Sequence, residues 1–397
     1  MPITQPEPEL RAWLRLSLEP TLTASQIYLL LSQLELPQHV LSASASTLSR
    51  FLPPQQVARL KADADSQTQA AIENTLKWLE HPHHHLLTMA DIPVYPASLL
   101  NLTDPPLLLY VNGRPELLAK QAIAIVGARS ATVAGTDNAR AFSSYLAQHN
   151  WCIVSGLAEG IDAAAHEGAL QAGAQGGSTI AVMATGIDLV YPARNRQLAH
   201  QIAEQGALVS EFPLGTRALP YHFPKRNRIV AALARGVLVV EAALKSGSLI
   251  TAKQASEIGR EVFAIPGSIH SPLSRGCHAL IRDGAKLVES GQDIHDELRH
   301  PSLLSQPHAS KKPVVRSTRE NENTSVKVLA HSEPAAQNSF ALLAAMGFDP
   351  IDLDTLCERT GLGAAALNSA LFELEMAGLV AREDDGRFLQ RPSQGKL

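Results

Sequence analysis

The sequence predicts a doubly wound α/β fold with a mainly parallel sheet, preceded by a helical module and followed by a smaller winged-helix-like module. Between residues 122 and 283, short apolar runs rich in β-branched residues alternate with segments of helical periodicity. Such runs are typical of strands buried on both faces of a parallel sheet. Several turns after these runs are rich in small or cationic residues, as expected where an α/β sheet binds a ligand.

Residues 1 to about 80 are expected to form a helical module. Apolar residues recur there at three- and four-residue spacing, as in Ile27, Leu30, Leu31 and Leu34, which is the spacing of one helix face. We expect Pro37 to close that helix, a second to begin at the proline pair 53–54, and a third to cover residues 70–79. Apolar runs broken by prolines over residues 87–113 predict extended segments that lead into the main domain.

The alternating region predicts six strands and six helices. The strands are expected at Ala122–Val126, Cys152–Ser155, Ser178–Met183, Ala207–Ser210, Gly236–Val240 and Val262–Ala264. The helices are expected at Thr136–Gln148, Ile161–Ala172, Gln197–Glu204, Asn227–Ala234, Ser248–Ile258 and Gly276–Asp283. After a polar stretch without periodicity, three more helices and a small hairpin are expected over Phe340–Met346, Leu353–Thr360, Ala364–Ala377 and Leu379–Leu389.

Composition limits the kind of protein this can be. The formal net charge of −4 means that any polyanion would have to bind a local cationic patch. Cys152, Cys277 and Cys357 are odd in number and lack CxxC spacing, which excludes a disulfide framework and favours a reducing compartment. Neither a signal peptide nor an apolar run of about 20 residues is visible. We therefore expect a cytoplasmic protein that does not contact a membrane.

Four turns are expected to meet at the carboxyl edge of the sheet, where open α/β sheets bind ligands. They are Gly127–Ser130, Ser155–Gly160, Pro220–Arg228 and Lys245–Ser248. Glycine lets backbone amides approach a phosphate closely, and Arg129 adds a planar fork suited to phosphate oxygens. Their glycine spacing matches neither GxGxxG nor the Walker pattern, which disfavours a dinucleotide or P-loop triphosphate site.

The segment Phe223-Pro-Lys-Arg-Asn-Arg228 carries the strongest signal. Its cations can hold phosphates, its amide can bond a base edge or sugar, and its ring can stack on a base of any sequence. The alternatives are a solvated, salt-bridged surface for the cations and a core position for Phe223. Ser246–Thr251 begins a predicted helix whose amides can hold a further phosphate. Together these segments point to nucleic acid.

For two groups of titratable residues, the sequence favours a structural role over an acid/base or metal-binding one. Glu159, Asp162 and His166 share the face of one helix start, where acids complement the helix dipole; an acid/base or metal group is the alternative. Four histidines between His81 and His85 flank a proline, and a polar junction fits them better than a structural metal site. We expect no catalytic residue, no metal and no cofactor.

At this point the motifs resemble those of the DNA-processing protein A family (DprA, also called Smf), over roughly residues 85–290. The shared motifs occur in order as Ile125-Val-Gly-Ala-Arg129, Ser155–Asp162 with His166, Ile180–Gly186, Tyr191-Pro192, Ser210–Pro213, Phe223–Arg228, Val239–Ala242, Ser246–Thr251 and Ile265–Gly267. This chain has Ala128 where many members have serine. It also lacks the lysine that some relatives carry just before the Phe223 motif.

The resemblance implies a non-catalytic protein that binds single-stranded DNA (ssDNA) during natural transformation. It would protect the incoming strand, help load RecA onto it, and act as a dimer of Rossmann-like cores. Phe223 would stack on a base. The DNA-binding residues implied in this sequence are Gly127, Ala128, Arg129, Ser155, Gly156, Phe223, Lys225, Arg226, Asn227, Arg228, Ser246, Gly247, Ser248 and Thr251.

Periodicity and composition divide the chain into four parts, a layout similar to that of longer family members. The parts are a helical, SAM-like module (1–80), an extended Rossmann-like DNA-binding core (81–299), a flexible linker (300–336) and a winged-helix-like module (337–392). The predicted recognition helix, residues 364–377, contains Glu373 and Glu375 and no lysine or arginine. Because a major-groove reader needs cations at its contact face, we expect this module to contact protein or to add little DNA affinity.

Two other functions stay open on the sequence. One is a nucleotide phosphoribohydrolase of the lysine-decarboxylase-like family, which has a related architecture. That family uses a PGGxGT-type loop followed by a glutamate, whereas Lys245–Thr251 here lacks both the glycine pair and the acid. The other is a protein-interaction scaffold, which the acidic C-terminal module favours.

Overall fold

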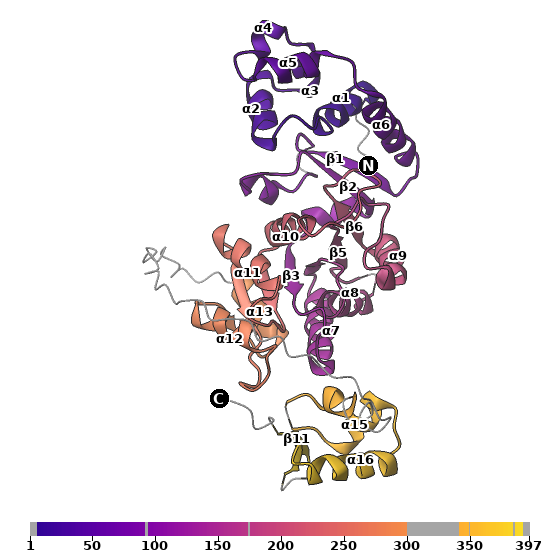
Figure 1. The fold of residues 1–397 in the computed structure, drawn as a ribbon, viewed down its shortest axis with the longest axis vertical. Helices are drawn as coiled ribbons and strands as arrows, with labels where there is room; N and C mark the ends of the chain where they lie inside the picture. The colour runs from indigo at the N-terminus through magenta and orange to yellow at the C-terminus, as the bar shows by residue number, and fades with distance from the viewer. Residues whose placement is uncertain are drawn as a thin grey trace, which may run out of the picture. The chain divides into compact units, whose positions relative to one another are not determined.

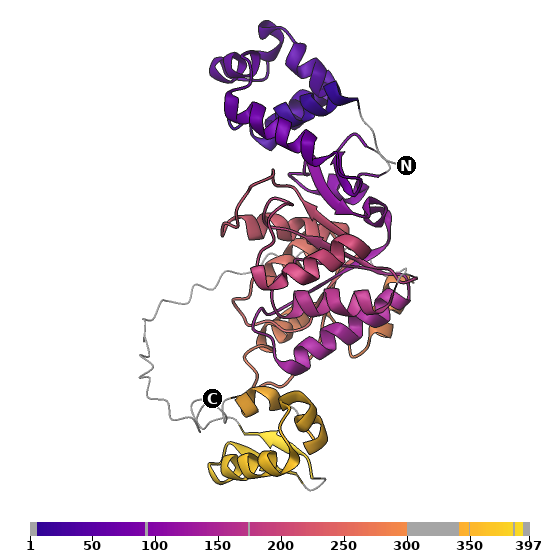
Figure 2. The same cartoon turned by 90° about the vertical axis from the view of Figure 1, so that its right-hand side faces the viewer.

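The computed structural model describes residues 6–91, 94–173, 175–299, 341–348, 350–383 and 386–391. These residues form two compact units, of which the larger comprises most of the first 295 residues and the smaller most of the rest. Figure 1 gives the order of the elements, and Figure 2 shows them after a 90° turn. The predicted linker at 300–336 lies outside the described residues. The predicted limits of the four parts stay predictions.

In the described part of the larger unit, nine strands form one sheet in the order β1-β2-β6-β5-β4-β3-β7-β8-β9. All neighbours from β6 to β9 run parallel, while β1 and β2 are antiparallel to each other and β2 is antiparallel to β6. This confirms the mainly parallel, doubly wound sheet. The strands are β1 His84–Thr88, β2 Leu108–Gly113, β3 Ala122–Val126, β4 Cys152–Ser155, β5 Thr179–Val182, β6 Ala207–Ser210, β7 Gly236–Val239, β8 Glu261–Ala264 and β9 Lys286–Leu287.

The strand order places a switch point at the centre of the sheet. From β3 the chain winds outward through β4, β5 and β6, and then crosses back to place β7 on the other side of β3. The loops that leave β3 and β7 therefore diverge, which opens a crevice at their carboxyl ends. This crevice is where the candidate site lies. The sequence predicted β1 and β2 only as extended segments and did not predict β9.

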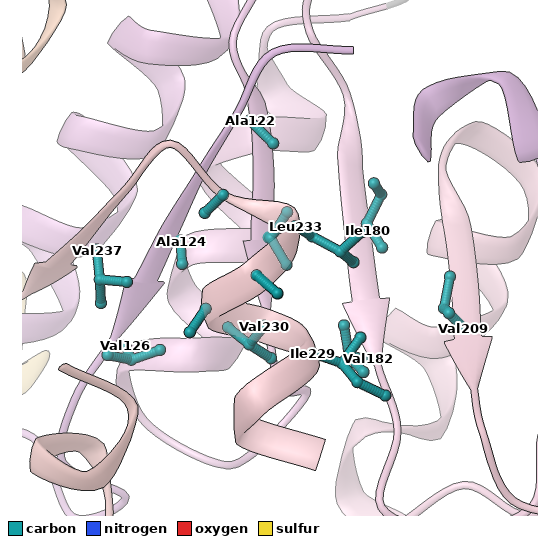
Figure 3. Close-up of a cluster of buried hydrophobic side chains, with 14 of the residues drawn as sticks. Ala122, Ala124, Val126, Ile180, Val182, Val209, Ile229, Val230, Leu233 and Val237 are labelled. Carbon is teal, nitrogen blue, oxygen red and sulfur yellow. The ribbon is translucent and has the colours of Figure 1, made fainter. Parts of the chain in front are cut away.

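The parallel strands bury both faces, as their continuous apolar runs require. Ala124 and Val126 of β3, with Val154 of β4 and Val182 of β5, belong to the core that also holds helix α10 (His222–Leu233). Figure 3 shows Ile229, Val230 and Leu233 of that helix among side chains of these strands. Leu208 and Ala181 point to the opposite core, which packs against α9 (Arg196–Gln205). Alternate residues of each strand thus serve opposite layers.

The remaining helices of the sheet domain follow the predicted order. They are α7 Val133–Gln148, α8 Ile161–Gln171, α11 Ser248–Glu257, α12 Arg275–Arg282 and α13 Gly291–Arg299, of which only α13 was not predicted. Cys152 and Cys277 are buried and free, and burial raises the pKa of each thiol to about 12. In the part of the chain that the structure describes, no helix has both the length and the apolar character needed to cross a membrane.

One boundary was predicted wrongly, and it bears on the site. Helix α10 begins at His222, not at Asn227, so residues 223–228 lie on a helix and not in a loop. Pro224 occupies the first turn of this helix. Backbone amides of that turn have no acceptor within the helix, so a proline there costs no hydrogen bond.

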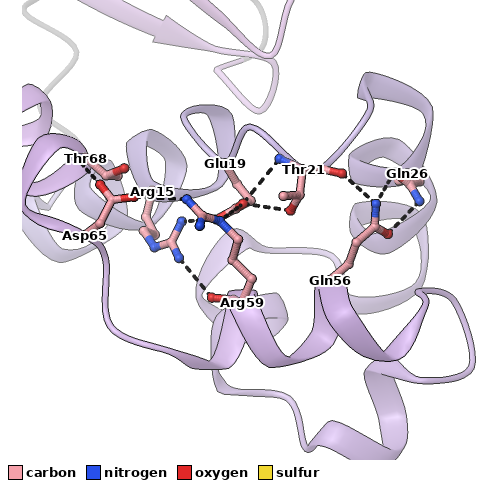
Figure 4. A network of polar contacts seen from close by, with 8 residues as sticks. All are labelled: Arg15, Glu19, Thr21, Gln26, Gln56, Arg59, Asp65 and Thr68. Carbon is pink, nitrogen blue, oxygen red and sulfur yellow. Dashed lines mark hydrogen bonds and ion pairs between the residues drawn. The ribbon is translucent and has the colours of Figure 1, made fainter.

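The N-terminal part is helical as predicted, with more and shorter helices. They are α1 Glu7–Ser17, α2 Ala24–Leu34, α3 Pro37–Ser42, α4 Ala45–Leu48, α5 Pro54–Lys61 and α6 Ser66–Trp78. Pro37 does not close α2, which ends at Leu34, but starts α3 after two intervening residues. Buried Glu19 joins the helices: it accepts hydrogen bonds from Arg15 Nη1 at 2.7 Å and from Arg59 Nε at 2.8 Å. Figure 4 shows this network, which also includes Thr21.

The smaller unit has the predicted winged-helix order. Residues 341–346 are helical, and α15 (Leu353–Thr360) and α16 (Ala364–Met376) follow. Strands β10 (Val380–Arg382) and β11 (Phe388–Gln390) pair antiparallel as the expected hairpin. Leu356 and Leu371 are among the residues of its core. Phe372 and Met376 of α16 are exposed, beside the acidic residues of the same helix.

Candidate functional site

A pocket of about 210 Å³ lies at the switch point of the sheet. It is smaller than the roughly 300–1,000 Å³ of typical small-molecule sites, so it can enclose one phosphate or part of a base. Its lining comes from the ends of β3 and β4 and from the starts of α8, α10 and α11. The lining residues are Val126, Gly127, Arg129, Gly156, Ala158, Asp162, Phe223, Pro224, Arg226, Asn227, Val230, Ser246, Gly247, Ser248, Ile250 and Thr251.

A cation lies over an aromatic ring at the mouth of this pocket. Arg129 lies in the turn that follows β3, and Phe223 projects from the first turn of α10. The guanidinium carbon of Arg129 lies 5.0 Å from the centroid of the Phe223 ring, within the range of a cation–π contact. Arg129 is exposed and Phe223 is partly exposed, so both remain open to a ligand.

A second arginine lies beneath the pocket. The side chain of Arg226 is only 5% exposed; its Nη1 donates to the Val182 carbonyl at 3.2 Å and lies 3.9 Å from Asp162 Oδ2. A Cβ atom added to Gly156 would lie 1.3 Å from Arg226 Nη1. Glycine is therefore required at position 156 because the guanidinium occupies the space of any larger side chain. Buried arginine stays protonated, so it adds fixed positive charge to the site.

Asp162 is the acid that holds this arginine. Its Oδ2 also accepts the backbone amide of Gly156 at 3.1 Å and that of Ala158 at 3.4 Å. Burial raises the pKa of the Asp162 carboxyl, while Arg226 and these two amides act in the opposite direction. The sequence pointed to Asp162 as a dipole-complementing residue at a helix start, and the structure adds that it lines the pocket and pairs with Arg226.

The start of α11 forms the opposite wall. Ser246 and Ser248 share a hydrogen bond between their hydroxyls at 2.7 Å, and the Ser248 amide donates to Ser246 Oγ at 3.4 Å. From α10, Asn227 Nδ2 approaches the Gly247 carbonyl at 3.5 Å. The pocket lining thus has three hydroxyl residues, with Thr251 as the third, and a carboxamide beside its cations, and the starts of three helices surround it, an arrangement that suits an anion.

Comparison with known proteins agrees with this architecture. Residues 85–299 match the family model of DNA recombination-mediator protein A, and residues 330–386 match the DprA winged helix domain. Protein Smf of Escherichia coli is 43% identical over 317 residues, which cover 80% of each chain. The chain belongs to the DprA/Smf family. This confirms the resemblance found in the sequence.

Two solved structures of the DprA family are similar to this one. DNA processing protein A from Streptococcus pneumoniae is 38% identical with a TM-score of 0.62, covering 75% of this chain and 99% of that one. The Helicobacter pylori structure, which concerns the ssDNA binding mode of that protein, is 30% identical with a TM-score of 0.50, covering 55% and 98%. These neighbours and the winged-helix match support the observed fold class.

Most residues that the DprA resemblance implied line the pocket. Those that do are Gly127, Arg129, Gly156, Phe223, Arg226, Asn227, Ser246, Gly247, Ser248 and Thr251. Ala128 and Ser155 lie beside it but are buried, and the Ser155 hydroxyl donates to the Ile125 carbonyl at 2.6 Å. Lys225 is exposed on α10 outside the pocket lining.

Arg228 does not line the pocket but forms ion pairs within the fold. It is buried between two acids, Glu211 and Asp104, and its Nε lies 3.2 Å from Asp104 Oδ2. The nearby Tyr28 belongs to α2, and burial is the main cause that raises the pKa of its hydroxyl, with Arg228 acting in the opposite direction. The structure therefore turns Arg228 toward the N-terminal helices and away from the pocket.

His166 and Glu159, the other members of the predicted helix-start group, also have structural partners. Glu159 lies 3.9 Å from Arg194. His166 is fully buried, with Nδ1 2.7 Å from Thr179 Oγ1. Because Thr179 donates its own proton to the Ile153 carbonyl, the imidazole Nδ1 must donate to Thr179. Protonation would then leave a buried Nε2–H without an acceptor, and burial lowers the pKa of His166 to about 3.

Two other features lack the chemistry of a site. The ring of His84 stacks on Trp78 and that of His81 packs on His84, and the described residues include no group of three or more His, Cys, Asp or Glu side chains that could hold a metal. A shallow hollow of about 440 Å³ lies along α7. Its arginine, Arg140, is already paired with Asp137 and Glu167.

Replacing Gly156 with alanine should displace the Arg226 guanidinium and leave Asp162 buried without its cation. We expect the free energy of unfolding to fall by about 1–3 kcal/mol, as for other overpacked sites, measured by urea denaturation. Gly247→Ala is the matched control, because a Cβ at Gly247 meets nothing within 4 Å. Equal stability of both variants would contradict this account of Gly156.

His166 should make the protein less stable as the pH falls below about 6.5. Below this pH the imidazole of the unfolded chain binds a proton, whereas the folded imidazole, with a pKa of about 3, stays neutral. Protonation therefore stabilises the unfolded state relative to the folded one. The loss due to His166 should reach about 2 kcal/mol between pH 6.5 and 5. In urea denaturation, His166→Gln should lack this part of the pH dependence, whereas His200→Gln, at an exposed position, should retain it.

Proposed function

We propose that this pocket binds ssDNA without performing chemistry on it. The observation that carries the proposal is the Arg129–Phe223 pair above the buried Arg226. A guanidinium and a ring side by side match the two parts of a nucleotide, its phosphate and its base. Both groups lie in the sheet domain, at the crevice whose position the strand order sets.

The size of the pocket favours a polymer that enters one unit at a time. About 210 Å³ is too small to surround a whole nucleoside triphosphate or a dinucleotide, whereas a flexible strand can insert one base or phosphate and leave the rest outside. Stacking on a ring and contact with phosphates are insensitive to base identity. The proposed site therefore binds strands of any sequence.

The charge of the protein directs such binding to one place. With a formal net charge of −4, most of the surface does not attract a polyanion, while Arg129 and Arg226 meet at the pocket and Lys225 is exposed on the same helix as Arg226. Asp162 neutralises part of the positive charge of Arg226. Arg129 and Lys225 thus supply the exposed positive charge, and the buried Arg226 adds a positive charge inside the pocket.

Membership of the DprA/Smf family supports a biological setting for this activity. The Helicobacter pylori relative is described with an ssDNA binding mode, and its family is named for DNA recombination mediation. We place this chain in the cytoplasm, where it would protect ssDNA taken up in natural transformation and load RecA onto it. In this proposal it acts as a homodimer, and the acidic α16 faces protein partners.

The proposal excludes phosphoribohydrolase activity. The acid in the pocket, Asp162, is held by Arg226 and two backbone amides, and the loop at 245–251 lacks the glycine pair and glutamate of that enzyme family. Incubation with nucleoside monophosphates should therefore release no free base, as followed by chromatography. Base release that disappears in Asp162→Asn would replace the binding proposal with an enzymatic one.

Arg129→Ala and Lys225→Ala should each weaken binding to oligo-dT and reduce its salt dependence. Removing one cation from a phosphate should lower the slope of log K against log salt concentration by about 0.7 for a single strand. Fluorescence anisotropy at several salt concentrations measures both quantities. Lys77→Ala is the control, because Lys77 is an exposed lysine on α6. If both test variants bind like the parent protein, the assigned site is wrong.

A further inference from the structure

Tyr191 lies next to the proposed site with an unassigned ring. The motif Tyr191-Pro192 belongs to the loop between β5 and α9, which supplies none of the residues that line the pocket. The Tyr191 ring meets Phe223 edge to face, with centroids 5.9 Å apart and planes inclined by 62°. Despite this contact, 51% of Tyr191 is exposed. A large aromatic surface therefore stays open to solvent beside the ring proposed to stack on a base.

The geometry points to a second base-stacking position on Tyr191. This inference rests on the proposed function and extends it from one nucleotide to two. Because the two rings are inclined by 62°, one flat base cannot lie on both. A base on Phe223 and its neighbour on Tyr191 would each meet a separate aromatic face, and the strand would turn between them.

The loop that carries Tyr191 is held in place relative to the pocket. Buried Asn195 donates from Nδ2 to the carbonyls of Leu157 at 3.0 Å and Ala158 at 3.1 Å. Those carbonyls belong to the turn after β4, whose residue Ala158 lines the pocket. The Gly186 amide also donates to the Thr216 carbonyl at 2.9 Å. Tyr191 is thus presented on a braced loop, which lowers the entropic cost of binding a base.

The same loop supplies a cation for the phosphate beyond the second base. Arg194 has a side chain that is 82% exposed, and its only ion pair among the described residues is a long one, at 3.9 Å, to Glu159. An exposed guanidinium with a loosely held partner can turn to a phosphate at little cost. The inferred path of the strand runs from Arg129 and Phe223 onto Tyr191 and toward Arg194.

Affinity measurements on the full-length protein test this inference. Tyr191→Ala should weaken binding to oligo-dT roughly five- to tenfold, the lower part of the range for loss of one stacking ring, while Tyr191→Phe should stay within about twofold. Phe372→Ala, which removes an exposed ring of α16 in the other unit, is the matched control and should bind like the parent. Phe223→Ala tests the proposed function separately.

The outcomes are distinguishable. If Phe223→Ala weakens binding and Tyr191→Ala does not, the second position is wrong and the proposed site stands. If neither variant weakens binding, the proposed site fails as well. Weaker binding by Tyr191→Ala could also reflect reduced support for the Phe223 ring, so contact must be shown directly. An oligo-dT carrying 5-iododeoxyuridine, irradiated in complex with the parent protein, should cross-link to Tyr191; cross-linking at Phe223 alone overturns the inference.

Discussion

The burial of Arg226 under the switch point of the sheet is the constraint on which the site depends. A buried guanidinium needs a countercharge, which Asp162 of α8 supplies 3.9 Å from Nη1, while the Val182 carbonyl of β5 accepts a hydrogen bond from the same nitrogen. This requirement fixes glycine at position 156 and fixes the turn after β4, because the same carboxylate accepts two of its amides. One buried pair therefore sets the shape of the pocket floor, and the exposed Arg129 and Phe223 lie above it.

The two ends of α10 serve different needs. Its first two turns face the pocket through Phe223, Arg226 and Asn227, whereas later residues such as Ile229 and Leu233 pack on the sheet (Figure 3). Arg228 lies between these parts and pairs with Glu211 and Asp104. The helix is thus anchored along its length while its start remains accessible. A rigid helix start suits recognition by stacking and charge, since little order has to be created when a strand binds.

The proposed binding of a polyanion requires an acidic protein to confine its positive potential to one place. Here the acids near the site pair with buried cations: Asp162 with Arg226 in the pocket lining, and Glu211 with Arg228 outside it. The exposed cations are therefore Arg129, in the pocket lining, and Lys225, outside it on α10. Tyr191, which is exposed on the loop after β5 and contacts Phe223, adds an aromatic surface beside these cations, and such a surface suits a base.

Apolar periodicity and turn composition are local properties, so the sequence alone predicted the parallel sheet, most of its strands and helices and the motifs at the strand ends, but not β9 or α13. It could not decide the roles of the cations in residues 225–228. On a helix, successive residues point about 100° apart, so Lys225 is exposed, Arg226 enters the pocket and Arg228 pairs with acids outside it. Their partners Asp162, Glu211 and Asp104 are distant along the chain, and only the tertiary structure brings them together.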